Sequence, residues 1–255
     1  MSQRDEPLLK TSINENTSPL HNSSVITKFH PISHTLITIT QLILSTLCLL
    51  YIPSSKLLDD PVKCLNITTI TLFFVQLLIE STRWLLYLQG DGIETNQSVK
   101  VMFKNLIENK GKHFAHALWI TLFGAFMFHL IAVVFGAPAI DDVQNTWLFA
   151  IYISLLAIYP PAYAFKNHGP IWARVFSDGS PESIPEKLIY YTTVSTVVGA
   201  WLGAIVIPLD WDRPWQVWPI PCVIGGFIGH GIGSIISLLV CCFGDEDDTI
   251  QKKRK

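Results

Sequence analysis

Residues 114–136 read FAHALWITLFGAFMFHLIAVVFG, a run without Asp, Glu, Lys or Arg. A helix needs ~20 such residues to cross ~30 Å of hydrocarbon. The whole chain shares this bias, because 49% of its 255 residues are hydrophobic and only 15% are charged, against about 25% charged residues in soluble domains. Since a helix satisfies its own backbone hydrogen bonds in lipid at this length, the run predicts a membrane-spanning helix.

Five further apolar runs have a similar length, and the six together predict an all-α polytopic membrane protein. On this basis we expect a disordered cytosolic tail over residues 1–31, a six-helix membrane domain over 32–243 and a charged cytosolic tail over 244–255. The six predicted helices are 32–52, 64–88, 114–136, 146–165, 188–209 and 218–242.

The basic residues predict the orientation of these helices. Fourteen of the 18 Lys and Arg residues flank the helices on one side, which holds both ends of the chain and the connections near 100–112 and 166–187. The cytosolic side of a membrane protein carries such an excess, so both termini are predicted to be cytosolic. The same reasoning places the connection between the last two helices in the lumen.

The last four residues are KKRK, which put Lys252 and Lys253 fourth and third from a cytosolic carboxyl terminus. This arrangement looks like a dilysine retrieval signal for the endoplasmic reticulum, an address that a receptor reads. The alternative interpretation is a basic flank that only orients the last helix.

Composition also excludes several classes of protein. The net charge is −2 and the basic residues form no aromatic-laced patch, so nucleic-acid binding is not expected. Five cysteines are too few for a disulfide scaffold in a chain of this length. No metal site is predicted, because the paired histidines His113 and His116 have no third ligand at a suitable spacing.

Polar side chains inside the predicted helices are candidates for function, because they are costly in hydrocarbon. Glu80 and Arg83 lie three residues apart on one helical face, where their charges can neutralise each other. They could position the helix as a snorkelling pair, or bind a lipid phosphate or a partner helix. His129 and His230 are expected to form interhelical hydrogen bonds, with catalysis as the less favoured role.

Small residues recur every four positions in the last two helices, and such faces let two backbones approach closely. Because only a short connection joins these helices, we expect a close-packed antiparallel hairpin. Gly226 and Gly231 widen the small face of the last helix, which leaves room for a third helix or for a helix of a partner. The residues of the two repeats are Ser195, Gly199 and Gly203, and Gly225, Gly229 and Gly233.

Residues 208–220, between these helices, read PLDWDRPWQVWPI, a dense set of charged and aromatic side chains. In one interpretation Arg213 binds a phosphate, the two Asp residues bind an ammonium group and a Trp ring stacks on it. In the other the segment is a rigid turn with interfacial Trp anchors, satisfied by Asp–Arg pairs and fixed by Pro. The residues concerned are Asp210, Trp211, Asp212, Arg213, Trp215 and Trp218.

This segment, with the Gly-rich helix on either side of it, closely resembles the Pig-F family of glycosylphosphatidylinositol (GPI) anchor biosynthesis. The resemblance is strong over the last two helices and looser, though colinear, over the others. It implies a multi-pass protein of the endoplasmic reticulum membrane that binds and stabilises the large ethanolamine-phosphate transferases of GPI synthesis. Asp210, Trp211, Asp212, Arg213, Pro214, Trp215 and Trp218 carry the family motif here.

The resemblance therefore implies a non-catalytic accessory subunit, whose partners move ethanolamine phosphate from phosphatidylethanolamine to mannoses of the GPI precursor. The sequence itself is consistent with a non-catalytic role. The short lumenal connections cannot fold a two-metal transferase site, and Glu80 is the only interior carboxylate of the predicted helices. No cofactor is expected, although phosphatidylethanolamine remains a candidate bound lipid. The alternative is a protein that itself presents, flips or transfers phosphatidylethanolamine. Membrane lipids are expected partners in both cases.

Overall fold

The computed structural model describes residues 31–90 and 99–252, with side chains over 33–83 and 111–242. Residues 1–30 of the tail predicted over 1–31 lie outside the described residues, as does Lys253, and Pro31 is the first residue of α1. The described chain is helical throughout its ordered elements, which confirms the all-α class. The helices are α1 (Pro31–Leu50), α2 (Pro61–Gly90), α3 (Val99–Val134), α4 (Val143–Ala157), α5 (Tyr159–Phe165), α6 (Gly169–Trp172), α7 (Ile184–Ala204) and α8 (Ile220–Lys252), with a π-helical turn at Ala173–Ser177 and a 3-10 turn at Pro214–Gln216.

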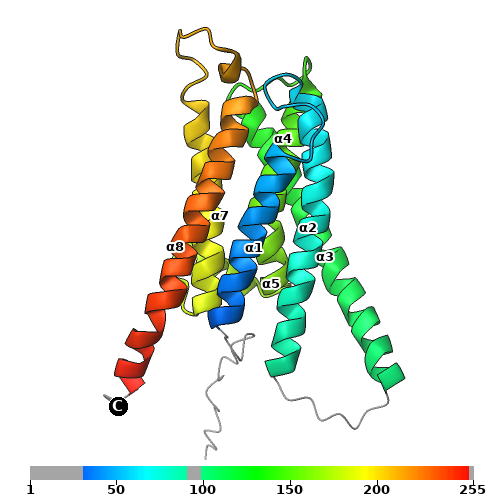
Figure 1. Ribbon diagram of the computed structural model, residues 1–255, viewed down its shortest axis with the longest axis vertical. Helices are drawn as coiled ribbons and strands as arrows, with labels where there is room; N and C mark the ends of the chain where they lie inside the picture. The colour runs from blue at the N-terminus through cyan, green and yellow to red at the C-terminus, as the bar shows by residue number, and fades with distance from the viewer. Residues whose placement is uncertain (1–30, 91–98, 253–255) are drawn as a thin grey trace, which may run out of the picture.

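The long helices run alongside one another and form an elongated bundle (Figure 1). The connections after α1, α3 and α7 lie at one end of the bundle, whereas α1 begins and α8 ends at the other (Figure 1). The described chain thus starts and finishes at the same end, as the predicted topology requires. Which end faces the cytosol stays a prediction.

Four helices of the described chain are long and apolar enough to cross a membrane, and a fifth crossing results if α4 and α5 count as one bent span. Helix α7 is not among them. The predicted number of six spans therefore remains a prediction. The four are Ser33–Leu50, Pro61–Arg83, Gly111–Val134 and Ile220–Cys242.

Several helices are longer than the runs that predicted them. Helix α3 begins at Val99 instead of residue 114, and α8 continues to Lys252. Most of the segment predicted as a separate charged tail is thus an extension of α8. A charged segment outside hydrocarbon can continue a helix at no desolvation cost, so apolar length alone underestimates helices at their aqueous ends.

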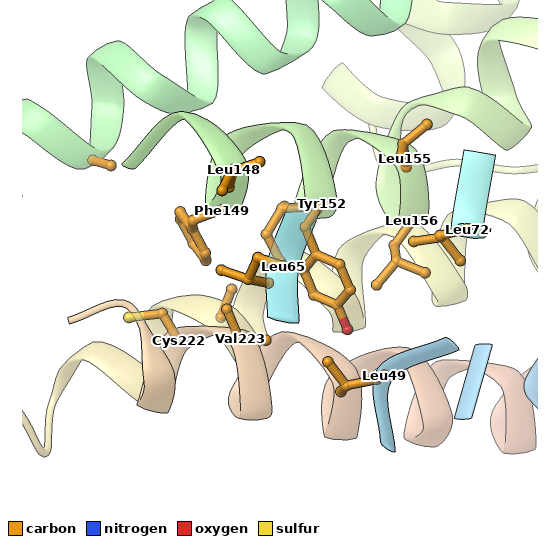
Figure 2. Close-up of a cluster of buried hydrophobic side chains, with 13 residues drawn as sticks. Leu49, Leu65, Leu72, Leu148, Phe149, Tyr152, Leu155, Leu156, Cys222 and Val223 are labelled. Atoms are coloured by element: carbon orange, nitrogen blue, oxygen red, sulfur yellow. The ribbon is translucent and has the colours of Figure 1, made fainter. Parts of the chain in front are cut away.

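Helix α4 lies at the centre of the bundle, and most of its residues are buried. Tyr152 and Leu156 of α4 pack with Leu65 of α2, Leu49 of α1 and Val223 of α8 (Figure 2). Because α4 contacts α2, α3, α7 and α8, this core holds the other helices in place.

The segment predicted as one helix over 146–165 is broken, since α4 and α5 meet at an angle of 42°. Pro160 and Pro161 follow the break and have no N–H to donate to the carbonyls four residues earlier. One of these carbonyls, that of Ala157, instead accepts a hydrogen bond from Thr193 Oγ1 of α7 at 3.0 Å. A side chain of a neighbouring helix thus supplies a donor that the broken helix lacks, as membrane interiors demand.

Candidate functional site: the α7–α8 hairpin, its turn and the interior polar chain

Helices α7 and α8 pack backbone against backbone along the predicted small faces. A Cβ atom added to Gly199 would lie 2.8 Å from the Cα of Gly229, and one added to Gly203 would lie 3.0 Å from the Cα of Cys222. Both separations are at or below the limit that real Cβ atoms tolerate. Only glycine therefore permits this approach, which replaces hydrophobic drive by van der Waals contact in lipid.

The contact continues toward the other end of the hairpin. A Cβ on Gly229 would meet the backbone of Ser195, and one on Gly233 would lie 2.7 Å from the Cα of Thr192. There Thr192 Oγ1 and Ser237 Oγ are 3.1 Å apart, and Ser237 Oγ also donates to the carbonyl of Leu188 at 2.9 Å. The register is antiparallel, because residue numbers fall along α7 as they rise along α8.

Two further glycines in the described part of α8, Gly226 and Gly231, face helices of the same chain. A Cβ on Gly226 would lie 2.6 Å from Cδ1 of Ile153 in α4, so α4 is the third helix at this position. Gly231 is looser, since its nearest neighbour would be Cδ1 of Leu42 in α1 at 3.9 Å. The space predicted at these two glycines for a third helix or a partner is thus taken by α4 and, more loosely, by α1.

Gln216 organises the backbone of the turn between α7 and α8. Its Oε1 accepts a hydrogen bond from the backbone N–H of Arg213 at 2.9 Å. Its Nε2 donates to the carbonyls of Val206 and Leu209, both at 2.8 Å. Gln216 is buried, so one amide side chain is the partner of the Arg213 N–H and adds a second hydrogen bond to two carbonyls that also accept the N–H groups of Leu209 and Trp211.

Trp218 anchors the same turn to α4. Its Nε1 donates to Thr146 Oγ1 at 3.1 Å, and Thr146 Oγ1 donates to the carbonyl of Pro138 at 3.0 Å. The indole ring also makes an edge-to-face contact with Phe149, with ring centroids 5.0 Å apart. The turn is therefore rigid, but Gln216 and Trp218 hold it, rather than the Asp–Arg pairs that the rigid-turn interpretation invoked.

The other predicted residues of the turn are exposed. Trp211 and Trp215 are 54% and 36% exposed, and their ring centroids lie 5.9 Å apart. Within the described ranges, Arg213 takes part in no ion pair. Asp212 adopts a positive φ of 47°, and Asp210, Asp212 and Arg213 all face solvent. These side chains thus lie on the surface of a rigid turn whose conformation does not depend on them.

The interior of the bundle contains a chain of polar side chains around the predicted pair Glu80 and Arg83. Arg83 Nη1 donates to Glu80 Oε1 at 3.0 Å, and Arg83 Nη2 donates to Gln41 Oε1 at 2.7 Å. Gln41 Nε2 then donates to Gln76 Oε1 at 3.3 Å, and Gln76 Nε2 donates to the carbonyl of Leu155 at 3.1 Å. This polar chain links α1, α2 and α4.

Burial explains why the ion pair needs that chain. Glu80 is only 2% exposed, and a buried charge is tolerated only when it is paired and hydrogen-bonded. Since Arg83 also bonds to α1, the pair does more than snorkel. It joins two helices that have no hydrophobic drive to associate within lipid.

The two predicted histidines have different partners. His230 is fully buried, and its Nδ1 lies 3.3 Å from Thr196 Oγ1 of α7. Thr196 Oγ1 donates its own proton to the carbonyl of Thr192 at 2.6 Å, so the His230 Nδ1–H must be the donor. His129 stacks on Trp147 of α4, with centroids 4.3 Å apart. His230 thus makes the interhelical hydrogen bond that was expected, whereas His129 makes an interhelical stack.

Several residues that build this region are absent from the sequence-based predictions. Gln41, Gln76 and Gln216 carry no charge and belong to no motif, so only their place inside apolar runs or in a buried turn could have indicated them. Pro160 and Pro161 are a readable signal for the break between α4 and α5. Of the two lysines of the predicted retrieval signal, Lys252 is the last residue of α8.

Comparison with known proteins places these features in a family. Residues 39–238 match the sequence model of the GPI biosynthesis protein family Pig-F. A human protein described as "GPI ethanolamine phosphate transferase, stabilizing subunit" is 34% identical over 198 residues, which cover 72% of this chain and 90% of the human protein.

Two further relatives match shorter segments. The mouse protein of the same description is 45% identical over 118 residues, or 46% of this chain and 54% of the relative. The "Glycosylphosphatidylinositol anchor biosynthesis protein 11" of Yarrowia lipolytica is 41% identical over 113 residues, or 44% and 48% of the two chains. No solved structure matches the chain.

Proposed function

Because the chain belongs to the Pig-F family of GPI biosynthesis proteins, an accessory role in GPI anchor synthesis follows, and we propose that it is a non-catalytic subunit that stabilises ethanolamine-phosphate transferases. The proposed partners are the large transferase subunits, and the proposed compartment is the endoplasmic reticulum membrane, with Lys252 and Lys253 as its retrieval signal. The names of the human and mouse relatives support the stabilising role.

One observation supports the proposed docking site: the residues that hold the turn in place are different from those whose side chains it exposes. Gln216 and Trp218 hold the turn. The side chains of Trp211, Arg213 and Trp215 are exposed, and none of them forms an ion pair within the described residues. Trp and Arg are the residues that most often dominate binding energy at protein interfaces. A preformed turn also loses little entropy when a partner binds.

The α7–α8 hairpin supplies the support for this docking surface. Its backbones are in contact along the glycine faces, so the two helix ends that the turn joins are held at a fixed separation. The proposed subunit therefore presents one fixed aromatic and charged surface to a larger enzyme.

The test is co-purification of tagged protein with a transferase subunit, comparing wild type with Arg213→Ala and with Trp211→Ala. We expect each variant to retain expression but to recover about tenfold less partner, or less still. A tenfold loss corresponds to ~1.4 kcal/mol of binding energy, which is what a dominant interface residue contributes. Val217→Ala is the matched control, because Val217 is exposed in the same turn and 58% accessible. Normal recovery of partner by both variants would refute the docking surface.

The second candidate function is handling of phosphatidylethanolamine by this chain. The exposed turn carries both charge signs, with Asp210 and Asp212 beside Arg213, and these suit an ammonium and a phosphate group respectively. Under this alternative Arg213→Ala would leave partner recovery unchanged and abolish transfer. Purified protein alone would then move or cleave phosphatidylethanolamine in liposomes, whereas a stabilising subunit would do neither.

A further inference from the structure

Basic side chains from two helices meet at the end of the bundle opposite the α7–α8 turn. His113 and His116 lie near the start of the membrane-spanning part of α3, on the side of Ala117. Ala117 packs with Ala162 of α5 in a buried cluster. Lys166 caps the end of α5. The packing of α3 on α5 therefore brings the His113 imidazole toward the lysine, and His116 lies one helical turn from His113.

Trp172 fixes the backbone at this lysine. Its Nε1 donates to the carbonyl of Lys166 at 3.2 Å, and its ring packs against the cluster that contains Ala117. Lys166 itself has a positive φ of 51°, so the chain reverses sharply there. The position of Lys166 beside α3 thus depends on specific contacts rather than on a loose loop.

This basic cluster, His113, His116 and Lys166, has no opposite charge within it. Lys166 and His116 are the basic groups that act on His113, and no carboxylate of the described residues forms an ion pair with either histidine. The buried carboxylates elsewhere are engaged, Glu80 by Arg83 and Glu186 by Arg174. Lys166 forms no ion pair in the part of the chain that the structure describes.

The cluster also contains an unused hydrogen-bonding atom. Nε2 of His116 is buried and has no hydrogen-bond partner within the described residues. Such an atom costs ~1–3 kcal/mol unless a partner satisfies it. The His116 side chain is itself partly exposed, so a turn of the ring toward the surface would present this atom beside the Lys166 ammonium and the His113 imidazole, where the three groups can donate to one ligand with several oxygens.

The depth of the cluster identifies the class of ligand. The candidate span of α3 begins at Gly111, and α5 ends at Phe165, so the basic cluster lies where hydrocarbon gives way to the head groups. Trp119, a turn deeper on α3, is 71% exposed, as an interfacial anchor would be. Phosphate groups are the anions present at this level.

We propose that His113, His116 and Lys166 form a binding site for the phosphate of an anionic phospholipid head group. The lysine supplies the charge, and the imidazole N–H groups donate hydrogen bonds to the phosphate oxygens. The site is separate from the turn that we propose as the docking surface, and it does not depend on the function assigned to that turn.

The test is native mass spectrometry of the full-length protein, purified in detergent and incubated with equal amounts of phosphatidylinositol and phosphatidylcholine. We expect wild type to retain phosphatidylinositol in preference, and Lys166→Gln to reduce that preference about fivefold, since one basic residue near a membrane surface contributes ~1 kcal/mol. Lys166→Arg should keep it. Because Lys166→Gln changes a partly exposed side chain that forms no ion pair within the described residues, the variant is expected to fold.

Lys187→Gln is the matched control, since Lys187 lies near the start of α7 and outside the basic cluster. An unchanged lipid preference in Lys166→Gln would overturn the proposal, and so would an equal loss in Lys187→Gln. Displacement of the lipid by inorganic phosphate at millimolar concentration would assign the site to a free anion and overturn the lipid assignment. Resistance to that displacement, with loss on substitution, supports it.

Discussion

Gly199 of α7 and Gly225 of α8 each present a hydrogen where any other residue would drive its Cβ into the backbone carbonyl of its counterpart. The relationship is reciprocal, because each Cβ would meet the carbonyl oxygen of the other residue. The close packing of the hairpin therefore depends on the absence of a side chain at these two positions. Its stability rests on close backbone contact, which in lipid is the main force available between helices.

The first prediction concerns the glycine contact between α7 and α8. Gly229→Ala should destabilise the protein by about 2 kcal/mol or more, since its Cβ would meet the backbone of Ser195, which cannot move without separating the helices. Gly231→Ala on the same helix is the control, with an expected effect of at most about 0.5 kcal/mol, because its Cβ would meet only Leu42 at 3.9 Å. Unfolding in detergent with increasing denaturant measures both. Equal effects of the two variants would contradict the close backbone contact at Gly229.

The second prediction concerns the turn. Gln216→Leu keeps the apolar volume but removes the acceptor of the Arg213 N–H and the donor to Val206 and Leu209. We expect a loss of about 1–3 kcal/mol, because the Arg213 N–H is left without a partner and the two carbonyls each lose one of their two hydrogen bonds. Amide hydrogen exchange at Arg213 should become faster by orders of magnitude. Val217→Ala in the same turn should leave that amide protected, and an equally protected amide in Gln216→Leu would show that other groups hold the turn.

The third prediction tests the interior polar chain. Gln76→Leu breaks the bond from Gln41 and the bond to Leu155, so we expect a cost of about 1–3 kcal/mol. Gln41→Leu should cost a similar amount. Combining the two should cost clearly less than the sum, because the residues act through one shared hydrogen bond. A double-mutant cycle on the melting of the purified protein provides the measurement, and strict additivity would mean that the chain is not connected.

The fourth prediction concerns the ion pair within that chain. Arg83→Met should destabilise the protein by about 3–5 kcal/mol, because it leaves the carboxylate of Glu80 buried without its partner. Replacing both residues, as Glu80→Gln with Arg83→Met, should recover part of this loss. Thr82→Ala is the control, since Thr82 is exposed and bonds only to its own helix. No recovery in the double variant would mean that Arg83 acts mainly through Gln41.

The fifth prediction is a pH dependence at the start of α2. Asp60 Oδ1 accepts the N–H of Lys63 at 3.0 Å, and Oδ2 pairs with Lys63 Nζ at 2.8 Å. The hydrogen bonds from Lys63 lower the pKa of Asp60 below its usual range. Its contribution is therefore complete above the ordinary carboxyl pKa and is lost as pH falls through the lowered value.

Amide exchange in the first turn of α2 should accordingly speed up only below about pH 4. Asp60→Asn keeps a capping acceptor but cannot titrate, so it should abolish this pH dependence while leaving exchange at neutral pH close to that of wild type. A dependence that persists in Asp60→Asn would place the titration at another group.

Much of the fold could be predicted from local pattern. The six apolar runs coincide with the helical segments of the bundle, although the run over 146–165 forms two helices and the number of true spans stays a prediction. Length and apolarity decide whether a segment can satisfy its backbone in lipid, and both are properties of the segment itself. The four-residue spacing of Gly199 and Gly203 likewise indicates a face for close packing before any partner is known.

The groups that hold the site together could not be predicted in the same way. Gln216 serves backbone groups up to ten residues away, and Gln76 reaches Leu155, 79 residues further along the chain. An amide side chain has no charge or motif that reveals such a partner. Its role depends on which backbone groups the assembled bundle leaves unsatisfied.

The sequence by itself therefore determined that this protein is a helical membrane protein with a glycine-faced hairpin and a turn rich in Trp, Asp and Arg, because these depend on composition and spacing along one segment. Only the tertiary structure decided which residues of the turn are free. Gln216 and Trp218 became its supports since Val206, Leu209 and Thr146 lie within hydrogen-bonding distance of them in the folded bundle. That geometry leaves Trp211, Arg213 and Trp215 on the surface.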